Sequence, residues 1–236
     1  MSLPVAILAG GLATRLRPLT EKIPKALIFI NQEPFVAHQL RLLHAGGIKK
    51  VVICAWYRGE LIRDFTGDGR RFGLEIEYSF DGERALGTGG ALRKALPLLG
   101  EAFFVLYGDS YLPCDYGKVE AAFLESRKDA LMTVYHNRDL GDRSNVQYSD
   151  GRIRVYDKEH RTKDMEHIDY GLGVLRAGTL ESYAPGQSFD LAEVYRRLLS
   201  AGQLAGYEVP ERFYEIGSLP GIQALEKHLE IRQPSK

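Results

Sequence analysis

The chain has 236 residues, of which 44% are hydrophobic, and its 31 Lys and Arg residues balance 31 Asp and Glu residues. This length suits one α/β domain or two small ones, and a formal net charge of zero argues against a general nucleic-acid-binding protein. No apolar run approaches the ~20 residues of a membrane span. The first apolar run, residues 5–9, is far shorter than a signal h-region, and two cysteines are too few for a disulfide framework. We therefore expect a soluble, cytoplasmic protein.

Strand-like and helix-like segments alternate through the first 135 residues. Apolar, β-branched runs predict strands, and apolar residues at helical spacing predict helices. In chain order we expect strands at 4–9, 50–55, 73–80, 102–107 and 130–135, and helices at 34–45, 59–65, 88–99 and 116–127. Strands joined by helices of this length predict βαβ units and a mostly parallel sheet.

The pattern changes after residue 135. Two strand-like runs flank Ser149-Asp150-Gly151, which is a hairpin signal. Further strands are expected at 169–177, 207–210 and 213–217, and helices at 190–201, with Asp190 as its N-cap, and at 219–232. We find no internal repeat or low-complexity linker, so we expect one domain over residues 1–236. Its α/β fold would be Rossmann-like, with a mostly parallel central sheet flanked by helices and a smaller mixed, hairpin-bearing half from about residue 136.

The loop after the first expected strand is rich in glycine and positive charge. Gly10 and Gly11 let the backbone approach a ligand and point N–H groups at an anion. Arg15 offers a planar fork of donors that suits phosphate oxygens, and Lys25 adds a compact charge. The loop matches neither the P-loop nor the dinucleotide-binding pattern. A phosphate site is favoured, and an ordinary strand-to-helix turn with solvated cations is the alternative.

A second strand end carries a carboxylate. Asp109 directly follows Gly108 and the expected strand 102–107, and ligands in an open parallel sheet bind beyond the carboxyl ends of strands. Mg²⁺ is usually held by one or two carboxylates together with phosphates and water, so Asp109 is a candidate metal ligand. The alternative is that it caps the next turn. Trp56 and Tyr57, after the strand at 50–55, could stack on a ligand, but the favoured interpretation is that they are buried packing residues.

The string LAGGLATRLRPLTEKIPKAL, residues 8–27, resembles the signature of the sugar-1-phosphate nucleotidyltransferases, or NDP-sugar pyrophosphorylases. That signature is a glycine-rich turn, then T-R-[LM]-x-P-x-T, then P-K; Ala13 stands where many members have glycine. VLYGDS, VYDKE, IDYGLGVL and FYEIGSLPG resemble later family segments, so the likeness covers most of the chain. It is strongest to short members such as heptose- or mannose-1-phosphate guanylyltransferases and N-acetylmuramate-1-phosphate uridylyltransferases.

This resemblance implies a GT-A-like fold and an enzyme that transfers a nucleotidyl group from an NTP to a sugar 1-phosphate, giving NDP-sugar and pyrophosphate. It favours GTP with heptose- or mannose-1-phosphate, with UTP second. Residues 1–135 would form the nucleotide-binding half and residues 136–236 the sugar-binding half. The attacking phosphate is already ionised at neutral pH, since its second pKa is about 6. No general base is therefore expected.

The resemblance also implies roles for individual residues. Arg15 and Lys25 would contact the triphosphate and Lys158 the sugar phosphate, while Asp109 and Glu215 would hold Mg²⁺, with Glu215 standing where the family has Asp. The residues expected to contact the nucleotide or the sugar are Leu8, Gly10, Gly11, Gly87, Thr88, Gly90, Asp157, Asp169 and Gly171. Asp169 stands where many members have Asn, so an acceptor-only carboxylate replaces an amide.

Three other functions stay open on sequence. A cytidylyltransferase for a phosphocholine-like acceptor would need an aromatic cage, for which Tyr111 and Tyr170 are available. A GT-A glycosyltransferase would need a D-x-D motif, but Asp109 is followed by Ser and Tyr. A non-catalytic subunit that binds nucleotide sugar is favoured by Glu215 alone. No nucleic-acid or membrane partner is expected, and the oligomeric state cannot be read from the sequence.

Overall fold

The structure, a computed structural model, describes residues 2–137 and 143–232. Its centre is a nine-stranded sheet with the order β10-β9-β11-β6-β1-β4-β5, in which β8 also pairs with β11 and β12 pairs with β8. The strands are β1 (Val5–Ala9), β4 (Lys50–Ala55), β5 (Glu75–Phe80), β6 (Ala102–Tyr107), β8 (Ala130–His136), β9 (Val146–Ser149), β10 (Arg152–Tyr156), β11 (His167–Arg176) and β12 (Leu204–Glu208). The sheet is continuous from the first half of the chain to the second.

The pairing confirms the expected fold class. β1 runs parallel to β4 and β6, and β4 runs parallel to β5, whereas β11 is antiparallel to β6 and β8. The predicted hairpin is formed by β9 and β10. The strand predicted at 207–210 begins earlier, because residues 204–208 pair in parallel with residues 130–134 of β8. That partner lies some seventy residues away in the chain and leaves no local signal.

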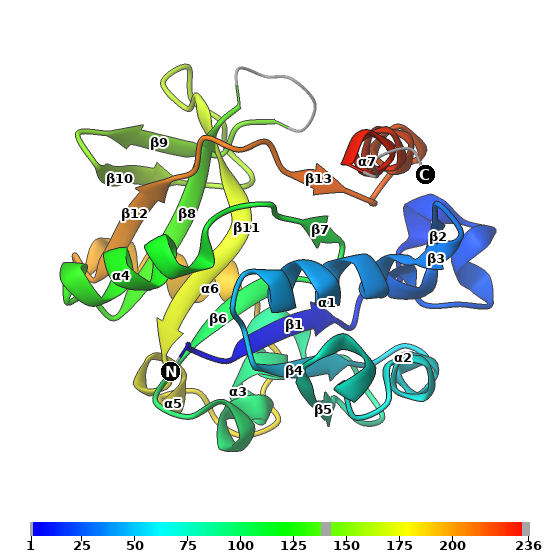
Figure 1. Cartoon of the computed structure of the whole chain (residues 1–236). Coiled ribbons are helices and arrows are strands. Elements are labelled where there is room, and N and C mark those ends of the chain that lie inside the picture. Colours follow the sequence, from blue (N-terminus) through cyan, green and yellow to red (C-terminus); the bar gives the residue numbers. More distant parts are fainter. Residues whose placement is uncertain (1, 138–142, 233–236) are drawn as a thin grey trace.

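Helices cover both faces of the sheet (Figure 1). Residues of α1 (Phe35–Ala45), α2 (Gly59–Thr66) and α4 (Tyr116–Ser126) share one apolar core with Val5 and Ile7 of β1. Residues of α3 (Gly87–Leu99), α5 (Gly178–Glu181) and α6 (Leu191–Ser200) share the other core with Ala6, as the alternation of side chains along a strand requires. Asp190 caps α6 as predicted, since its carboxylate accepts the Ala192 N–H. No helix in the described ranges is long and apolar enough to cross a membrane.

A third apolar cluster ties the end of the chain to its beginning. α7 (Leu219–Arg232) packs beside the short hairpin of β2 (Phe29–Ile30) and β3 (Glu33–Pro34), as Figure 1 shows. Another short pair, β7 (Ser110–Tyr111) and β13 (Tyr214–Glu215), is antiparallel. The cluster contains Leu16, Ile28, Ile30, Phe35, Tyr111, Ile216, Ile222, Leu225 and Leu229. Its packing brings the segment after β13 next to the N-terminal loop and to the end of β6.

Candidate active site

A cavity of about 400 Å³ lies at the carboxyl ends of the parallel strands β1, β4, β5 and β6. The sequence-predicted residues that line it are Leu8, Gly10, Gly11, Lys25, Gly87, Thr88 and Asp109. The other lining residues include Ala9, Leu12, Ala26, Cys54, Trp56, Asp81, Ala85, Ala91, Tyr107 and Gly108. The loops after four strands thus contribute to one site, as expected for an open parallel sheet.

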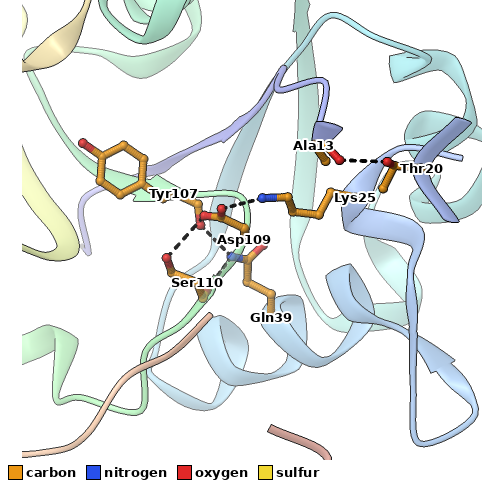
Figure 2. A network of polar contacts seen from close by, with 7 residues as sticks. All are labelled: Ala13, Thr20, Lys25, Gln39, Tyr107, Asp109 and Ser110. Atoms are coloured by element: carbon orange, nitrogen blue, oxygen red, sulfur yellow. Dashed lines mark hydrogen bonds and ion pairs between the residues drawn. The ribbon is translucent and has the colours of Figure 1, made fainter. Parts of the chain in front are cut away.

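Lys25 and Asp109 form an ion pair at the edge of this cavity (Figure 2). The Lys25 Nζ lies 2.8 Å from the Asp109 Oδ2, and the two side chains are 18% and 31% exposed. The backbone around Asp109 is held by the buried Gln39 of α1, whose Nε2 donates to the carbonyls of Tyr107 at 3.2 Å and Ser110 at 2.9 Å. In the described part of the chain the Asp109 carboxylate accepts from Lys25 and Ser110 and from no backbone N–H. It is therefore not a helix cap here.

The loop between β1 and β2 contains three short 3₁₀ turns, η1 (Thr14–Leu16), η2 (Leu19–Glu21) and η3 (Lys25–Leu27). Ala13 has a φ of 48°, in the left-handed region, which explains why glycine is common at this position in the resembling family. The Thr20 hydroxyl donates to the Ala13 carbonyl at 2.8 Å and fastens this bend (Figure 2). Ala13 is the N-cap of η1, which carries Arg15; Arg15 does not line the cavity of about 400 Å³.

Arg15, Lys25 and Asp109 meet around the segment after β13. A Cβ placed on Gly217 would lie 3.5 Å from an Arg15 guanidinium nitrogen and 3.9 Å from the Lys25 Nζ. The neighbouring Ile216 N–H donates to the Asp109 carbonyl at 3.0 Å. The two cations and the carboxylate thus lie on the same side of the molecule, at the carboxyl edge of the sheet.

Glu215 lies close to Arg15 and Asp109, but it lines a neighbouring cavity. Its Cα partner in the β7–β13 ladder is Ser110, the residue after Asp109. Its side chain lines a second cavity of about 330 Å³, which Arg15 also lines. In the described ranges, no group of three or more His, Cys, Asp or Glu residues is arranged to hold a metal. The half-exposed Asp109 suits an ion that takes its remaining ligands from phosphates and water.

The glycines at the start of α3 have a packing role that the sequence did not indicate. A Cβ on Gly87 would lie 2.6 Å from the Phe189 carbonyl oxygen. A Cβ on Gly90 would lie 2.4 Å from the Gln187 carbonyl oxygen. Gly90 does not line the cavity, and the Thr88 hydroxyl accepts the Leu191 N–H at 2.8 Å. This turn is therefore clamped against the second half of the chain, while Gly87 and Thr88 still face the cavity.

The sequence reasoning missed Asp81 as a cavity residue, and for Trp56 it favoured packing over stacking on a ligand. Trp56 is half-buried and lines the cavity, so its interpretation as a buried packing residue is wrong. Asp81 follows β5, and its Oδ2 accepts the Leu86 N–H at 2.8 Å. Burial raises the pKa of the Asp81 carboxyl, and the Leu86 N–H and the Lys94 charge act in the opposite direction. Both residues come directly after parallel strands, so the rule that singled out Asp109 could have found them.

Lys158 and Asp169 lie beyond the Tyr107 wall of the cavity and do not line it. Lys158 Nζ donates to the Tyr107 hydroxyl at 3.5 Å, a weak hydrogen bond. The Asp169 carboxylate accepts the Tyr156 O–H at 3.3 Å and the Gly171 N–H at 3.1 Å. Burial raises the pKa of the Asp169 carboxyl, and the Lys158 charge lowers it in part.

Asp157 occupies a turn. Its Oδ1 accepts the N–H groups of Glu159 at 2.8 Å and His160 at 3.0 Å. These hydrogen bonds hold the pKa of the Asp157 carboxyl below its ordinary value. One carboxylate oxygen is therefore engaged in shaping the turn that carries Lys158.

The model of the nucleotidyl transferase family matches residues 5–142, which is more than half of the chain. The chain belongs to the nucleotidyl transferase family. This nucleotidyl transferase is 30% identical to the UTP–glucose-1-phosphate uridylyltransferase of Synechocystis over 91% of its own length, and it spans 60% of that relative. It is also 30% identical to the D-glycero-alpha-D-manno-heptose 1-phosphate guanylyltransferase of Campylobacter jejuni, over 81% of this chain and 86% of that one.

Solved structures agree on the fold. A putative glucose-1-phosphate thymidylyltransferase from Bacillus anthracis superposes with a TM-score of 0.86 at 18% identity, covering 100% of this nucleotidyl transferase and 98% of that chain. The predictions of the family, of the enzyme class and of a GT-A-like α/β fold are thus confirmed. Enzymes of this family generally use a divalent metal ion. The roles of the individual site residues stay predictions.

Proposed function

We propose that this nucleotidyl transferase moves a nucleotidyl group from an NTP to a sugar 1-phosphate. A phosphate oxygen of the sugar attacks the α-phosphorus, the bond from that phosphorus to the bridging oxygen breaks, and pyrophosphate leaves. The observation that carries the proposal is the Lys25–Asp109 pair at the edge of the cavity, with Arg15 close by. Since the attacking oxygen is already ionised near neutral pH, the reaction needs charge neutralisation and alignment rather than a general base.

The main obstacle is repulsion between two polyanions, and the chain's cations address it. Arg15 and Lys25 both approach Gly217, from opposite ends of the N-terminal loop. They would contact the triphosphate, while the backbone of Gly10 and Gly11 faces the cavity. Lys158, on the other side of Tyr107, would hold the phosphate of the sugar. Preorganised charges of this kind stabilise a transition state without reorganisation during the reaction.

Asp109 is the proposed ligand of Mg²⁺, with Glu215 as the second carboxylate. When bound, the ion would neutralise charge on the phosphates. Asp109 is half-exposed at the cavity edge, and its present partner, Lys25, is a cation that triphosphate would also attract. Binding of NTP and metal would therefore exchange one ion pair for two favourable contacts. Glu215 would reach the ion from the segment that the β7–β13 ladder aligns with Asp109.

We further propose that the nucleotide binds within residues 1–135 and the sugar within residues 136–236 of one domain. The cavity is lined entirely by residues up to 109. By contrast, Asp169 and Gly171 lie on β11, and Asp157 and Lys158 lie in the turn that follows β10. The continuous sheet would keep the two substrates in a constant relative position. Heptose- or mannose-1-phosphate is the favoured sugar, because the Campylobacter relative carries heptose 1-phosphate in its name.

Guanine is the favoured base, with uracil second, and Asp81 supports that order. In the described structure, the Leu86 N–H is the one hydrogen-bond donor to its carboxylate, so both carboxylate oxygens keep acceptor sites for a ligand in the cavity. Guanine offers two adjacent donors on its Watson–Crick edge, whereas uracil offers one donor between two carbonyl acceptors that a carboxylate repels. Trp56, on the same cavity wall, provides a surface on which a base can stack.

Pyrophosphate release with four NTPs against several sugar 1-phosphates tests this proposal. We expect turnover with GTP to exceed that with UTP, and Asp81→Asn to reduce this preference by about tenfold, the value of one good bidentate contact. Glu83→Gln, on the same loop but outside the cavity lining, is the matched control. A lack of pyrophosphate with every pair would refute nucleotidyl transfer to sugars, while an unchanged preference in Asp81→Asn would refute the role of Asp81 alone.

A further inference from the structure

The ammonium group of Lys158 lies near two tyrosine rings. Its Nζ lies 5.4 Å from the ring centroid of Tyr107 and 5.9 Å from that of Tyr156, within the range of cation–π attraction. The same Nζ is 3.5 Å from the Tyr107 hydroxyl oxygen. The side chain of Lys158 is exposed, so without these rings it would sample many rotamers.

This environment differs from that of Lys25. Lys25 is paired with the Asp109 carboxylate at 2.8 Å. Within residues 2–137 and 143–232, no carboxylate forms an ion pair with Lys158, and the nearby Asp169 carboxylate accepts instead from Tyr156 and Gly171. An aromatic face attracts an ammonium group but does not neutralise it or take up all its donors. Lys158 is therefore oriented while its charge stays available to an anion.

Tyr107 stands between the two parts of the site. It is the last residue of β6, two positions before Asp109, and it lines the cavity. Its ring points away from the Lys25–Asp109 pair (Figure 2), and its carbonyl accepts from Gln39 at 3.2 Å. Gly171 has a φ of 92°, and a Cβ there would lie 3.3 Å from the Tyr107 ring. A side chain at position 171 would crowd the Tyr107 ring, and the positive φ also favours glycine there.

We propose that Tyr107 and Tyr156 are positioning residues that hold Lys158 for the phosphate of the sugar substrate. The inference rests on the proposed function, in which Lys158 contacts the sugar 1-phosphate. It adds that one residue, Tyr107, both lines the nucleotide cavity and contacts the phosphate-binding lysine. The position of the attacking phosphate relative to the α-phosphorus is then set through β6, the strand that also carries Asp109 at its end.

Steady-state kinetics of Tyr107 variants test the proposal. Tyr107→Leu removes the ring and the hydroxyl, and we expect it to raise the KM for the sugar 1-phosphate about fivefold while the KM for NTP changes less than about twofold, because a cation–π contact at an exposed site has up to roughly this value. Tyr107→Phe keeps the ring and should stay within about twofold of the wild type. Phe65→Leu, which removes the ring under Arg71 on the far edge of the sheet, is the matched control and should change neither KM.

A double-mutant cycle separates positioning from general structure. In a Lys158→Met background, Tyr107→Leu should no longer raise the KM for the sugar phosphate, since the ring then has no ammonium to hold. If Tyr107→Leu does not fold, pentafluorophenylalanine at position 107 replaces it, because that ring keeps the shape of Phe but reverses its quadrupole. It should raise the KM well above that of Tyr107→Phe.

Equal effects of Tyr107→Leu with and without Lys158, equal KM values for the Phe and pentafluorophenylalanine variants, or a larger change in the KM for NTP would each overturn the inference. Each of these results would leave the proposed reaction intact, provided that the wild type releases pyrophosphate. A wild type without any such turnover would overturn the proposed reaction and this inference together.

Discussion

Replacing Lys25 by Met should change metal binding and turnover in opposite directions. Lys25→Met keeps the length of the side chain and removes its charge. At 2.8 Å the gross attraction between Lys25 and Asp109 is about 6 kcal/mol for an effective dielectric of about 20. Screening and side-chain entropy reduce the net value of such partly exposed pairs to about 1 kcal/mol. Without this competitor, Asp109 should bind Mn²⁺ up to about fivefold more tightly in the absence of nucleotide.

Turnover should nevertheless fall by at least about 100-fold, the usual cost of losing one preorganised charge from a transition state. Mn²⁺ titration by calorimetry and single-turnover release of pyrophosphate at saturating substrates measure the two effects. Lys50→Met is the matched control, because Lys50 pairs with Glu77 at similar exposure, 32% and 35%, at the other end of the sheet. It should leave both measurements unchanged. Near-wild-type turnover in Lys25→Met, or weaker Mn²⁺ binding, would refute the reasoning.

Three further outcomes are expected. Glu215→Asp, which shortens a proposed metal ligand, should keep at least about a third of the wild-type turnover in a titration with Mg²⁺; complete loss would show that the longer side chain is built into a different geometry. Gly108→Ala should lower the free energy of unfolding by about 2 kcal/mol in urea, because its Cβ would lie 2.5 Å from the Leu8 carbonyl oxygen. Gly178→Ala, which meets no atom within 4 Å, should be neutral, and equal effects would contradict the clash. Burial lowers the pKa of His167 from 6.5, so as the pH falls the unfolded chain binds the proton before the native protein does. The free energy of unfolding should therefore be highest above pH 6.5 and decline as the pH falls toward the lowered native pKa. His167→Gln should remove this pH dependence. Urea unfolding at several pH values checks this, and an unchanged slope would exclude His167 as its source.

The strands of the sheet differ in how well the sequence predicts their bounds. β4 and β6 were predicted at their observed bounds, because buried strands of a parallel sheet are continuous apolar runs that need no knowledge of their partners. β12 was misplaced, and the short β2, β3 and β7 were missed, because strands of two residues carry no periodicity. Asp109 was found from its place after a strand, and the same rule applied to Asp81 and Trp56 would have found the remaining cavity wall.

The sequence by itself determined the layered α/β arrangement and the family, because burial periodicity and a contiguous loop motif are local properties of a chain. It also determined which cations and carboxylates could carry the chemistry. Only the tertiary structure decided how those groups meet: that Gly217 brings Arg15 beside Lys25, that Glu215 opens on a second cavity, and that Lys158 rests on Tyr107. These contacts join residues some fifty to two hundred positions apart. They depend on the packing of α7 and the register of β11 and β13, for which no short stretch of sequence carries a signal.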